Sequence, residues 1–197
     1  MESPNKSNKE LFEPVNSYFN FDSLELEPPG DLIIRKLSDM AEMYQDTEAA
    51  REILQEQDPM IYRFYNVEIP EEKAHLRHCI SMVFPGKIGD EYYMTKGHFH
   101  EVENTAEAYL TLQGQGKMVM QGPDNEIEIK EMKRGIITYV PPYWAHRCVN
   151  TGLQPLVFFA VYRGDAGHNY GIIEEKGMKK IIMEEDGSPV IKENPDY

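Results

Sequence analysis

Positions 95–100 read Thr95-Lys96-Gly97-His98-Phe99-His100, with two histidines separated by a single residue. On a β-strand, residues i and i+2 project from the same face, so both imidazoles can reach one metal ion while Phe99 packs on the other side. Such a pair alone is a weak signal, because a histidine in a strand is more often structural or exposed. Six residues separate His100 from Glu107, and six more separate Glu107 from Gly114. A hairpin connection of this length would bring Glu107 onto a strand beside the two histidines.

A second stretch lies further along the chain and reads Gly135-Ile-Ile-Thr-Tyr-Val-Pro141-Pro-Tyr-Trp-Ala-His146-Arg-Cys-Val-Asn150. Together, the two stretches resemble the paired signature motifs of the cupin superfamily. The first of these is HxH, a spacer, Glu, six residues and Gly, and the second is Gly-x5-Pro-x-Gly-x2-His-x3-Asn. The resemblance implies an all-β cupin fold, the double-stranded β-helix or jelly-roll barrel. It also implies one metal ion bound by His98, His100, Glu107 and His146.

Some positions depart from these motifs. Tyr143 stands where the second motif has its internal glycine, and Tyr92 stands where a leading glycine is expected. The spacer between His100 and Glu107 is longer than the common three or four residues. These departures predict a subfamily with a longer hairpin and leave the turn geometry near Tyr143 open, and none of them removes a ligand.

The remainder of the chain after Pro59 is rich in short β-branched and aromatic runs that are separated by turn signals such as Pro85-Gly86 and Asp186-Gly187. This pattern predicts an antiparallel sandwich or barrel. The expected strands are Ile61–Val67, Arg77–Phe84, Ala108–Leu112, Lys117–Gln121, Glu126–Lys130, Ile136–Val140, Leu156–Tyr162, Tyr170–Glu174 and Lys180–Met183.

The chain before Pro59 divides into an arm and a helical zone. Residues 1–30 are polar and interrupted by prolines, which predicts an extended N-terminal arm. Short helices are expected after it, one capped by Ser38 and a second capped by Asp46 or Thr47. The predicted cupin domain then covers residues 31–190, and residues 191–197 form a C-terminal tail.

The composition excludes several classes of function. A net charge of -14 leaves no basic face for nucleic acid. The longest apolar run, Leu156 to Tyr162, is too short to span a membrane, and the N-terminus has no apolar signal segment. Cys79 and Cys148 belong to no CxxC pair, which fits buried reduced thiols in a reducing compartment. We therefore expect a cytoplasmic protein.

The chemistry of the implied ligands restricts the metal. Three neutral imidazoles and one carboxylate suit a divalent first-row ion, with Fe²⁺ favoured and Ni²⁺, Mn²⁺ or Zn²⁺ as alternatives. One ion is expected in each subunit. In a six-coordinate ion, two positions remain open for substrate or water, and open positions are typical of a catalytic site.

A closer resemblance extends over nearly the whole chain, from about residue 15 to residue 190. The stretch Tyr93–His100 is similar to one in the archaeal cupin-type glucose-6-phosphate isomerases. So are the runs Arg35–Met40, Glu107-Ala-Tyr109 and Gly167-His168-Asn-Tyr170, together with Tyr162. The resemblance implies a metal-dependent enzyme that interconverts D-glucose 6-phosphate and D-fructose 6-phosphate in glycolysis and gluconeogenesis.

Moving a hydrogen between C1 and C2 of the sugar needs a Lewis acid and, on the enediol route, a base. Glu107 is a candidate base only if its carboxylate is loosely bound to the metal, and His168 is the other titratable candidate. Tyr109 shares the strand face of Glu107 and should point into the barrel. A direct hydride shift is the other possible route, and the sequence does not decide between them.

The substrate phosphate must bind to a protein that is itself negative, so local donors have to outweigh the overall field. The Thr95 hydroxyl and the backbone N–H groups around Gly97 lie just before the histidine pair and form a plausible cradle. The resemblance adds Ser81 and Tyr162 to this cradle, and it adds Tyr62 and Tyr170 as aromatic residues that line the pocket. Lys96 could be only a solvated residue.

Alternative functions are a metal-dependent cupin dioxygenase and a sugar-phosphate-binding module without catalysis. Activity on mannose 6-phosphate is a further possibility within the enzyme reading. A homodimer is expected, because an open antiparallel sheet leaves edges that need cover and the N-terminal arm could cross to a partner.

Overall fold

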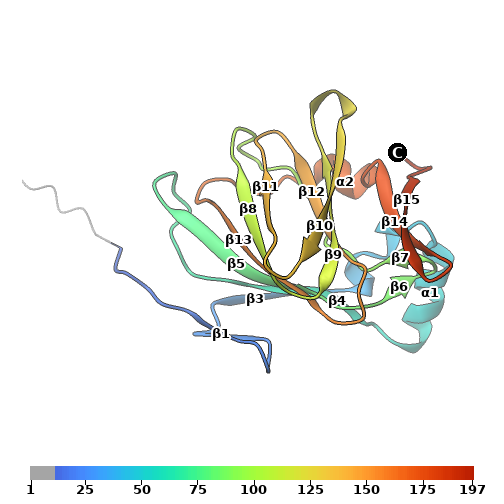
Figure 1. The fold of residues 1–197 in the computed structure, drawn as a ribbon, viewed down its shortest axis with the longest axis horizontal. Coiled ribbons are helices and arrows are strands. Elements are labelled where there is room, and N and C mark those ends of the chain that lie inside the picture. The colour runs from blue at the N-terminus through green and yellow to red at the C-terminus, as the bar shows by residue number, and fades with distance from the viewer. Residues whose placement is uncertain (1–11) are drawn as a thin grey trace, which may run out of the picture.

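The computed structural model describes residues 12–197, so residues 1–11 of the predicted arm lie outside the described part. Two antiparallel sheets form the body of the molecule (Figure 1). The larger has six strands in the order β11-β8-β13-β5-β4-β3, and the smaller has three in the order β10-β9-β12. The strands of the larger sheet are β3 (Asp31–Lys36), β4 (Met60–Asn66), β5 (Leu76–Val83), β8 (Glu107–Gln113), β11 (Ile137–Val140) and β13 (Leu156–Arg163).

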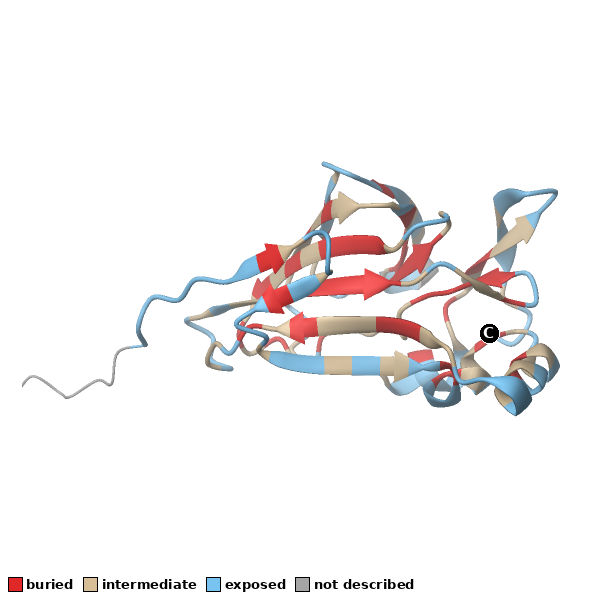
Figure 2. Ribbon diagram, turned by 90° about the horizontal axis from the view of Figure 1, so that it is seen from below, coloured by how far each residue is buried: buried red, intermediate tan, exposed pale blue. Residues whose placement is uncertain are grey.

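The smaller sheet is built from β9 (Gln115–Gln121), β10 (Ile127–Lys133) and β12 (Ala145–Asn150). Its buried side chains Met118 and Cys148 belong to the same apolar cluster as Tyr62 and Phe158 of the larger sheet. The core therefore lies between the two sheets, and Figure 2 shows that buried residues are concentrated within their strands. The prediction of an all-β cupin fold with short helices is confirmed.

Alternation along β8 decides which side chains face the space between the sheets. Glu107, Tyr109 and Thr111 are buried, whereas the intervening Ala108 and Leu110 are only partly buried. Because successive side chains of a strand point to opposite faces, the first three share the inner face. The register continues this face across the sheet, since Tyr162 of β13 lies opposite Glu107 and Ala160 lies opposite Tyr109.

A second apolar cluster lies on the outside of the larger sheet. Within the predicted arm, β1 (Tyr18–Asn20) and β2 (Glu25–Glu27) form a hairpin. Phe19 and Leu26 of this hairpin are buried against Tyr65, Met82 and their neighbours. Part of the predicted arm is thus held on the sheet by apolar burial.

The short helices lie largely where the sequence predicts them. Leu37–Asp39 and Ala41–Met43 are single 3-10 turns, and α1 spans Thr47–Glu56. The predicted Ser38 cap is wrong, because Lys36 occupies the N-cap of the first turn and Ser38 lies inside it. Asp46 caps α1, since its Oδ1 accepts a hydrogen bond from the Ala49 N–H at 2.9 Å.

A third sheet has the order β15-β14-β7-β6 and packs beside the smaller sheet. Its strands are β6 (Lys87–Ile88), β7 (Glu91–Tyr92), β14 (Lys180–Glu185) and β15 (Ser188–Glu193). β15 crosses position 190, where the predicted domain ends.

One predicted strand is wrong. Residues 170–174 were expected to be extended, but Gly171–Lys176 form the short helix α2, in which Ile173 is buried and Ile172 is exposed. In so short a run, one buried and one exposed isoleucine fit either period, so the sequence pattern does not separate a helix from a strand here. No helix among residues 12–197 is long and apolar enough to cross a membrane.

Candidate active site

Four side chains converge between the two sheets. The backbones of His98 and His146 lie directly opposite each other and are joined by two hydrogen bonds. The His98 N–H donates to His146 O at 3.2 Å, and the His146 N–H donates to His98 O at 3.1 Å. Glu107 is the first residue of β8, and His146 lies in β12. One ligand atom from each of His98, His100, Glu107 and His146 lies within 4.8 Å of the others.

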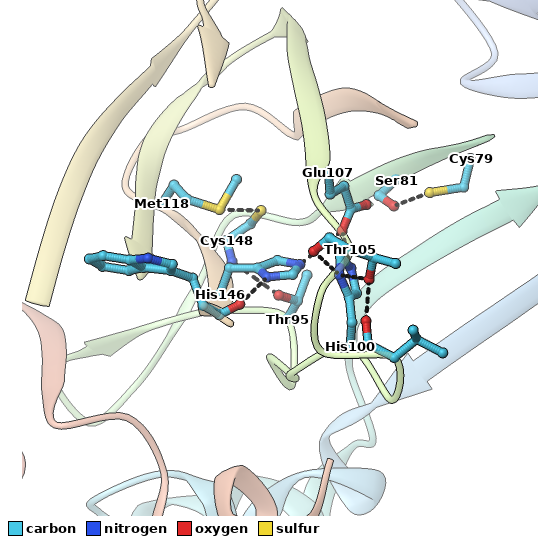
Figure 3. A network of polar contacts seen from close by, with 11 residues as sticks. Cys79, Ser81, Thr95, His100, Thr105, Glu107, Met118, His146 and Cys148 are labelled. Atoms are coloured by element: carbon cyan, nitrogen blue, oxygen red, sulfur yellow. Dashed lines mark hydrogen bonds and ion pairs between the residues drawn. The ribbon is translucent and has the colours of Figure 1, made fainter. Parts of the chain in front are cut away.

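Hydrogen bonds on the far side of the rings fix their protonation. His100 Nδ1 lies 2.8 Å from Thr105 Oγ1 and 3.0 Å from the Thr105 carbonyl oxygen. Thr105 Oγ1 already donates to Val102 O at 2.6 Å, so both atoms accept from His100 (Figure 3). His146 Nδ1 similarly faces the Trp144 carbonyl at 3.3 Å. Because carbonyls only accept, Nδ1 carries the proton in both rings, and each Nε2 turns a lone pair toward the cluster.

Unpaired nitrogen atoms in the cluster indicate that it can hold a metal ion. His98 Nε2 and His146 Nε2 are buried and make no hydrogen bond among the described residues. Glu107 Oε2 lies 3.0 Å from His146 Nε2 and 3.2 Å from His100 Nε2. Buried nitrogen lone pairs without a donor are costly. A divalent cation would satisfy them together with the carboxylate.

The members of the cluster shift one another's pKa values in different directions. Burial alone would raise the pKa of Glu107, but the adjacent imidazoles of His100 and His146 outweigh it and hold that pKa well below its usual range. Burial and the neighbouring imidazoles lower the pKa of His98. For His100, the bond to Glu107 overcomes burial and raises its pKa. The carboxylate is therefore ionised at neutral pH, as a metal ligand must be.

The cluster opens into a cavity between the two sheets. All of the predicted site residues except His100 line this cavity. They are Tyr62, Ser81, Thr95, Gly97, His98, Glu107, Tyr109, His146, Tyr162, His168 and Tyr170.

Aromatic rings form the wall above His98. The His168 ring centroid lies 4.5 Å from that of His98, and 6.0 Å from those of Tyr162 and Tyr170. Burial lowers the pKa of His168 and raises that of Tyr162. Both side chains are thus neutral near pH 7, and each can donate or accept hydrogen bonds to a hydroxylated ligand.

Tyr109 lies deeper, with its ring 5.7 Å from the His146 ring. Burial raises the pKa of Tyr109 well above its usual range, and the charge of Glu107 raises it further. Its hydroxyl therefore stays protonated.

Thr95 and Gly97 form one lip of the cavity. The Thr95 N–H donates to the Cys148 carbonyl at 2.9 Å, and the Cys148 N–H donates to Thr95 Oγ1 at 3.0 Å. With Oγ1 already accepting from the backbone, the hydroxyl proton of Thr95 is free for a ligand. Cys148 and Cys79 are free buried thiols, as expected.

The chain forms a turn at Tyr143, where the sequence left the geometry open. Tyr143 has φ +71°, the left-handed region that favours glycine, and its N–H donates to the Glu103 carbonyl at 2.8 Å. Glu103 lies in the longer spacer between His100 and Glu107.

At the end of the second motif, Asn150 donates through Nδ2 to Val83 O at 2.8 Å and to Gln154 O at 2.9 Å. This asparagine joins the second motif to the larger sheet.

The sequence analysis missed several residues that line the cavity or support it. Phe64 and Asn66 follow Tyr62 at intervals of two along β4, and Cys79 precedes Ser81 by two along β5. The alternation of these strands was sufficient to identify them. Thr105 gave no signal in the sequence, because its hydroxyl matters only through the fold.

Two packed antiparallel sheets that enclose a cluster of three histidines and one glutamate define a cupin with a metal-binding site. The family model "Glucose-6-phosphate isomerase (GPI)" matches residues 34–197. The glucose-6-phosphate isomerase of Thermococcus litoralis is 46% identical over 83% of this chain and 86% of the relative. That of Pyrococcus horikoshii is 44% identical over 93% and 96%. The chain belongs to this glucose-6-phosphate isomerase family.

More distant similarity was also found. A putative glucose-6-phosphate isomerase 2 of Rhizobium meliloti is 32% identical over 90% of both chains. Among solved structures, an oxalate oxidase aligns with a TM-score of 0.48 and 11% identity, over 57% of this chain and 56% of that one.

Proposed function

We propose that this protein is a metal-dependent aldose–ketose isomerase that interconverts D-glucose 6-phosphate and D-fructose 6-phosphate in glycolysis and gluconeogenesis. The proposal depends on one observation, that two kinds of site line the same cavity. The four-residue cluster that could hold a metal ion lies on one wall, and the lip with the Thr95 hydroxyl and the Gly97 N–H lies on another. The first can hold the reacting end of a sugar phosphate, and the second can hold its phosphate. Membership of the isomerase family supports the same reaction.

His98, His100, Glu107 and His146 would hold the metal, with Fe²⁺ favoured over Ni²⁺, Mn²⁺ and Zn²⁺. When bound, the ion supplies Lewis-acid polarisation of the oxygens on C1 and C2. The identity of the ion is a proposal that elemental analysis of protein purified without added metal would test. The double variant His98→Ala/His100→Ala should lose the ion. Its retention would contradict the ligand assignment.

The other residues of the cavity have distinct proposed roles. The lowered pKa of Glu107 makes it a weak base, which favours a role as ligand. Tyr109 stays protonated, so its hydroxyl can donate to a substrate oxygen beside the cluster. Neutral His168 lies against His98 and can accept a proton during ring opening or enediol formation.

The isotopic fate of the C2 hydrogen decides between the two routes. In the enediol route, deuterium at C2 of glucose 6-phosphate exchanges with solvent while a base holds it. In a hydride shift, the deuterium moves to C1 of fructose 6-phosphate. The mass of the product formed in light water would show which route operates.

For the phosphate, we propose that Thr95, Gly97, Ser81, Tyr62, Tyr162 and Tyr170 supply the donors. Burial raises the pKa of Tyr62 and of Tyr170, so both hydroxyls remain donors. A cradle of hydroxyls and backbone N–H groups presents positive partial charges to a dianion at short range, where they can outweigh the net charge of -14.

Incubating purified protein with fructose 6-phosphate and measuring glucose 6-phosphate tests the proposal directly. Binding without turnover would support the alternative of a sugar-phosphate-binding module without catalysis. Strict dependence of turnover on O₂ would support the dioxygenase reading instead. Mannose 6-phosphate should be assayed beside it, since it differs only in C2 stereochemistry.

We also propose a cytoplasmic homodimer. β11 is an edge strand of the larger sheet, and its Ile137 and Tyr139 are 72% and 60% exposed. An uncovered apolar edge strand favours association. Sedimentation of the purified protein as a monomer would contradict the homodimer.

A further inference from the structure

A buried arginine lies directly beside the metal cluster without belonging to it. Arg147 follows His146 in β12, so its side chain points to the opposite face of the strand, toward β7 and β14. It is only 2% exposed. The charge of Glu91 acts on it, but the two form no ion pair among the described residues. Burying an unpaired charge destabilises the fold, and an apolar side chain such as that of Val149 could fill the same face with a smaller desolvation penalty.

The guanidinium of Arg147 donates to one carbonyl of the cavity lip. Nε and Nη2 donate to the Lys96 carbonyl oxygen at 3.1 and 2.6 Å. Gly97 packs against the same side chain: a Cβ at this position would lie 3.1 Å from Arg147 Cβ and 3.1 Å from His146 O. Gly97 also has φ +77°. The arginine therefore fixes both the position and the orientation of the Lys96–Gly97 peptide.

That peptide connects the arginine to the cavity. The Lys96 carbonyl and the Gly97 N–H belong to one amide group, and charge-assisted bonds to the carbonyl polarise the group and strengthen the N–H as a donor. Gly97 lines the cavity, and among residues 12–197 its N–H has no hydrogen-bond acceptor. The positive charge behind the lip thus acts on the cavity through one peptide.

The neighbouring lysine does not supply this charge. Lys96 Nζ forms an ion pair with Glu174 at 2.8 Å, so its amine is already compensated. In a chain of net charge -14, a dianionic phosphate needs positive potential close to where it binds.

We propose that Arg147 is a positioning residue for the anionic end of the substrate, which holds and polarises the Lys96–Gly97 peptide so that Gly97 N–H and the Thr95 hydroxyl bind phosphate. The proposal rests on the isomerase function proposed above. It predicts that Arg147 affects binding of the phosphate, and that it leaves the chemistry at C1 and C2 unchanged.

The test compares Arg147→Met, Arg147→Lys and the control Val149→Ala. Methionine removes the charge and both donors but keeps an unbranched stem, and lysine keeps the charge and a single donor. Val149 shares the strand face of Arg147, is 3% exposed, and forms none of the bonds to Lys96. Its truncation loosens the same region without altering the lip.

In Arg147→Met, we expect the KM for fructose 6-phosphate and the Ki for inorganic phosphate each to rise about tenfold, equivalent to about 1.4 kcal/mol. The kcat and the metal content should stay at wild-type values. Arg147→Lys should give a smaller rise in both constants. Val149→Ala should leave both unchanged while lowering the melting temperature.

Wild-type KM and Ki values in the arginine variants would overturn the proposal, and so would equal rises in Val149→Ala or a loss confined to kcat or metal content. If Arg147→Met does not fold, Arg147→Lys decides. If the wild type gives no turnover, the isomerase function fails, and calorimetric titration with inorganic phosphate still decides whether Arg147 supports an anion site.

Discussion

Replacing Thr105 with valine would remove one hydroxyl from behind His100, one of the proposed metal ligands, and leave the shape of the side chain nearly unchanged. Thr105 is 2% exposed, and its Oγ1 accepts from His100 Nδ1 at 2.8 Å and donates to Val102 O at 2.6 Å. The Thr105 carbonyl remains as a second acceptor, 3.0 Å from the same Nδ1. The tautomer of His100 should therefore survive, while the orientation of the ring loses one of its two supports.

The expected magnitude follows from this partial loss. Removing a partner behind a metal-bound histidine weakens metal binding by about 10- to 100-fold. Because one acceptor remains, we expect the lower end, about a tenfold rise in the metal dissociation constant, or about 1.4 kcal/mol. The lost hydrogen bonds should also reduce the free energy of unfolding of the metal-free protein by about 1 kcal/mol. That corresponds to a fall of about 2–4 °C in melting temperature for a chain of this size.

Competition with a chromogenic chelator measures the first quantity, and thermal unfolding of the metal-free protein measures the second. Thr111→Val is the matched control, because Thr111 is 1% exposed on β8 and its hydroxyl has no hydrogen-bond partner among the described residues. This control should keep wild-type metal affinity and equal or greater stability, since a buried unpaired hydroxyl is removed. Unchanged metal affinity in Thr105→Val, or equal weakening in Thr111→Val, would refute the proposed support of His100.

Other expectations concern pH, catalysis and the helix. Below the raised pKa of His100 a proton competes with the metal for Nε2, so the apparent metal affinity should fall as pH decreases through that pKa and be constant above it. Chelator titrations between pH 5 and 9 would show this, and affinity that does not change with pH would contradict it. Tyr109→Phe should lower kcat at least tenfold with unchanged metal content, as measured by steady-state kinetics and elemental analysis. Asp46→Ala should cost about 1 kcal/mol of unfolding free energy through loss of the α1 cap, and a denaturant midpoint equal to wild type would contradict that role.

The sequence was most informative where chemistry depends on spacing. The two motifs predicted that His98, His100, Glu107 and His146 meet at one point, and the four side chains do lie together, because alternation in strands and the length of a hairpin are local properties. The strands β4, β5, β8, β9, β11 and β13 were also predicted to within two residues of their bounds.

Segments whose environment is set by distant parts of the fold were less predictable. Every residue of β12, Ala145–Asn150, is buried, so it has no polar–apolar alternation to reveal a strand. The third sheet lies on its other face and helps to bury Arg147. The helix α2 was taken for a strand because six residues are too few to separate the two periods.

The hydrogen bond between Tyr143 and Glu103 joins the two departures from the cupin motifs into one feature. A tyrosine in the left-handed region costs about 1–2 kcal/mol relative to a relaxed conformation, and the Glu103 carbonyl compensates by accepting its N–H. In this chain the long spacer supplies that carbonyl. Anyone who transplants this metal site into another barrel, or shortens the loop by protein design, should therefore change both places together. A trimmed loop would call for glycine at position 143, whereas a grafted tyrosine would call for the full loop.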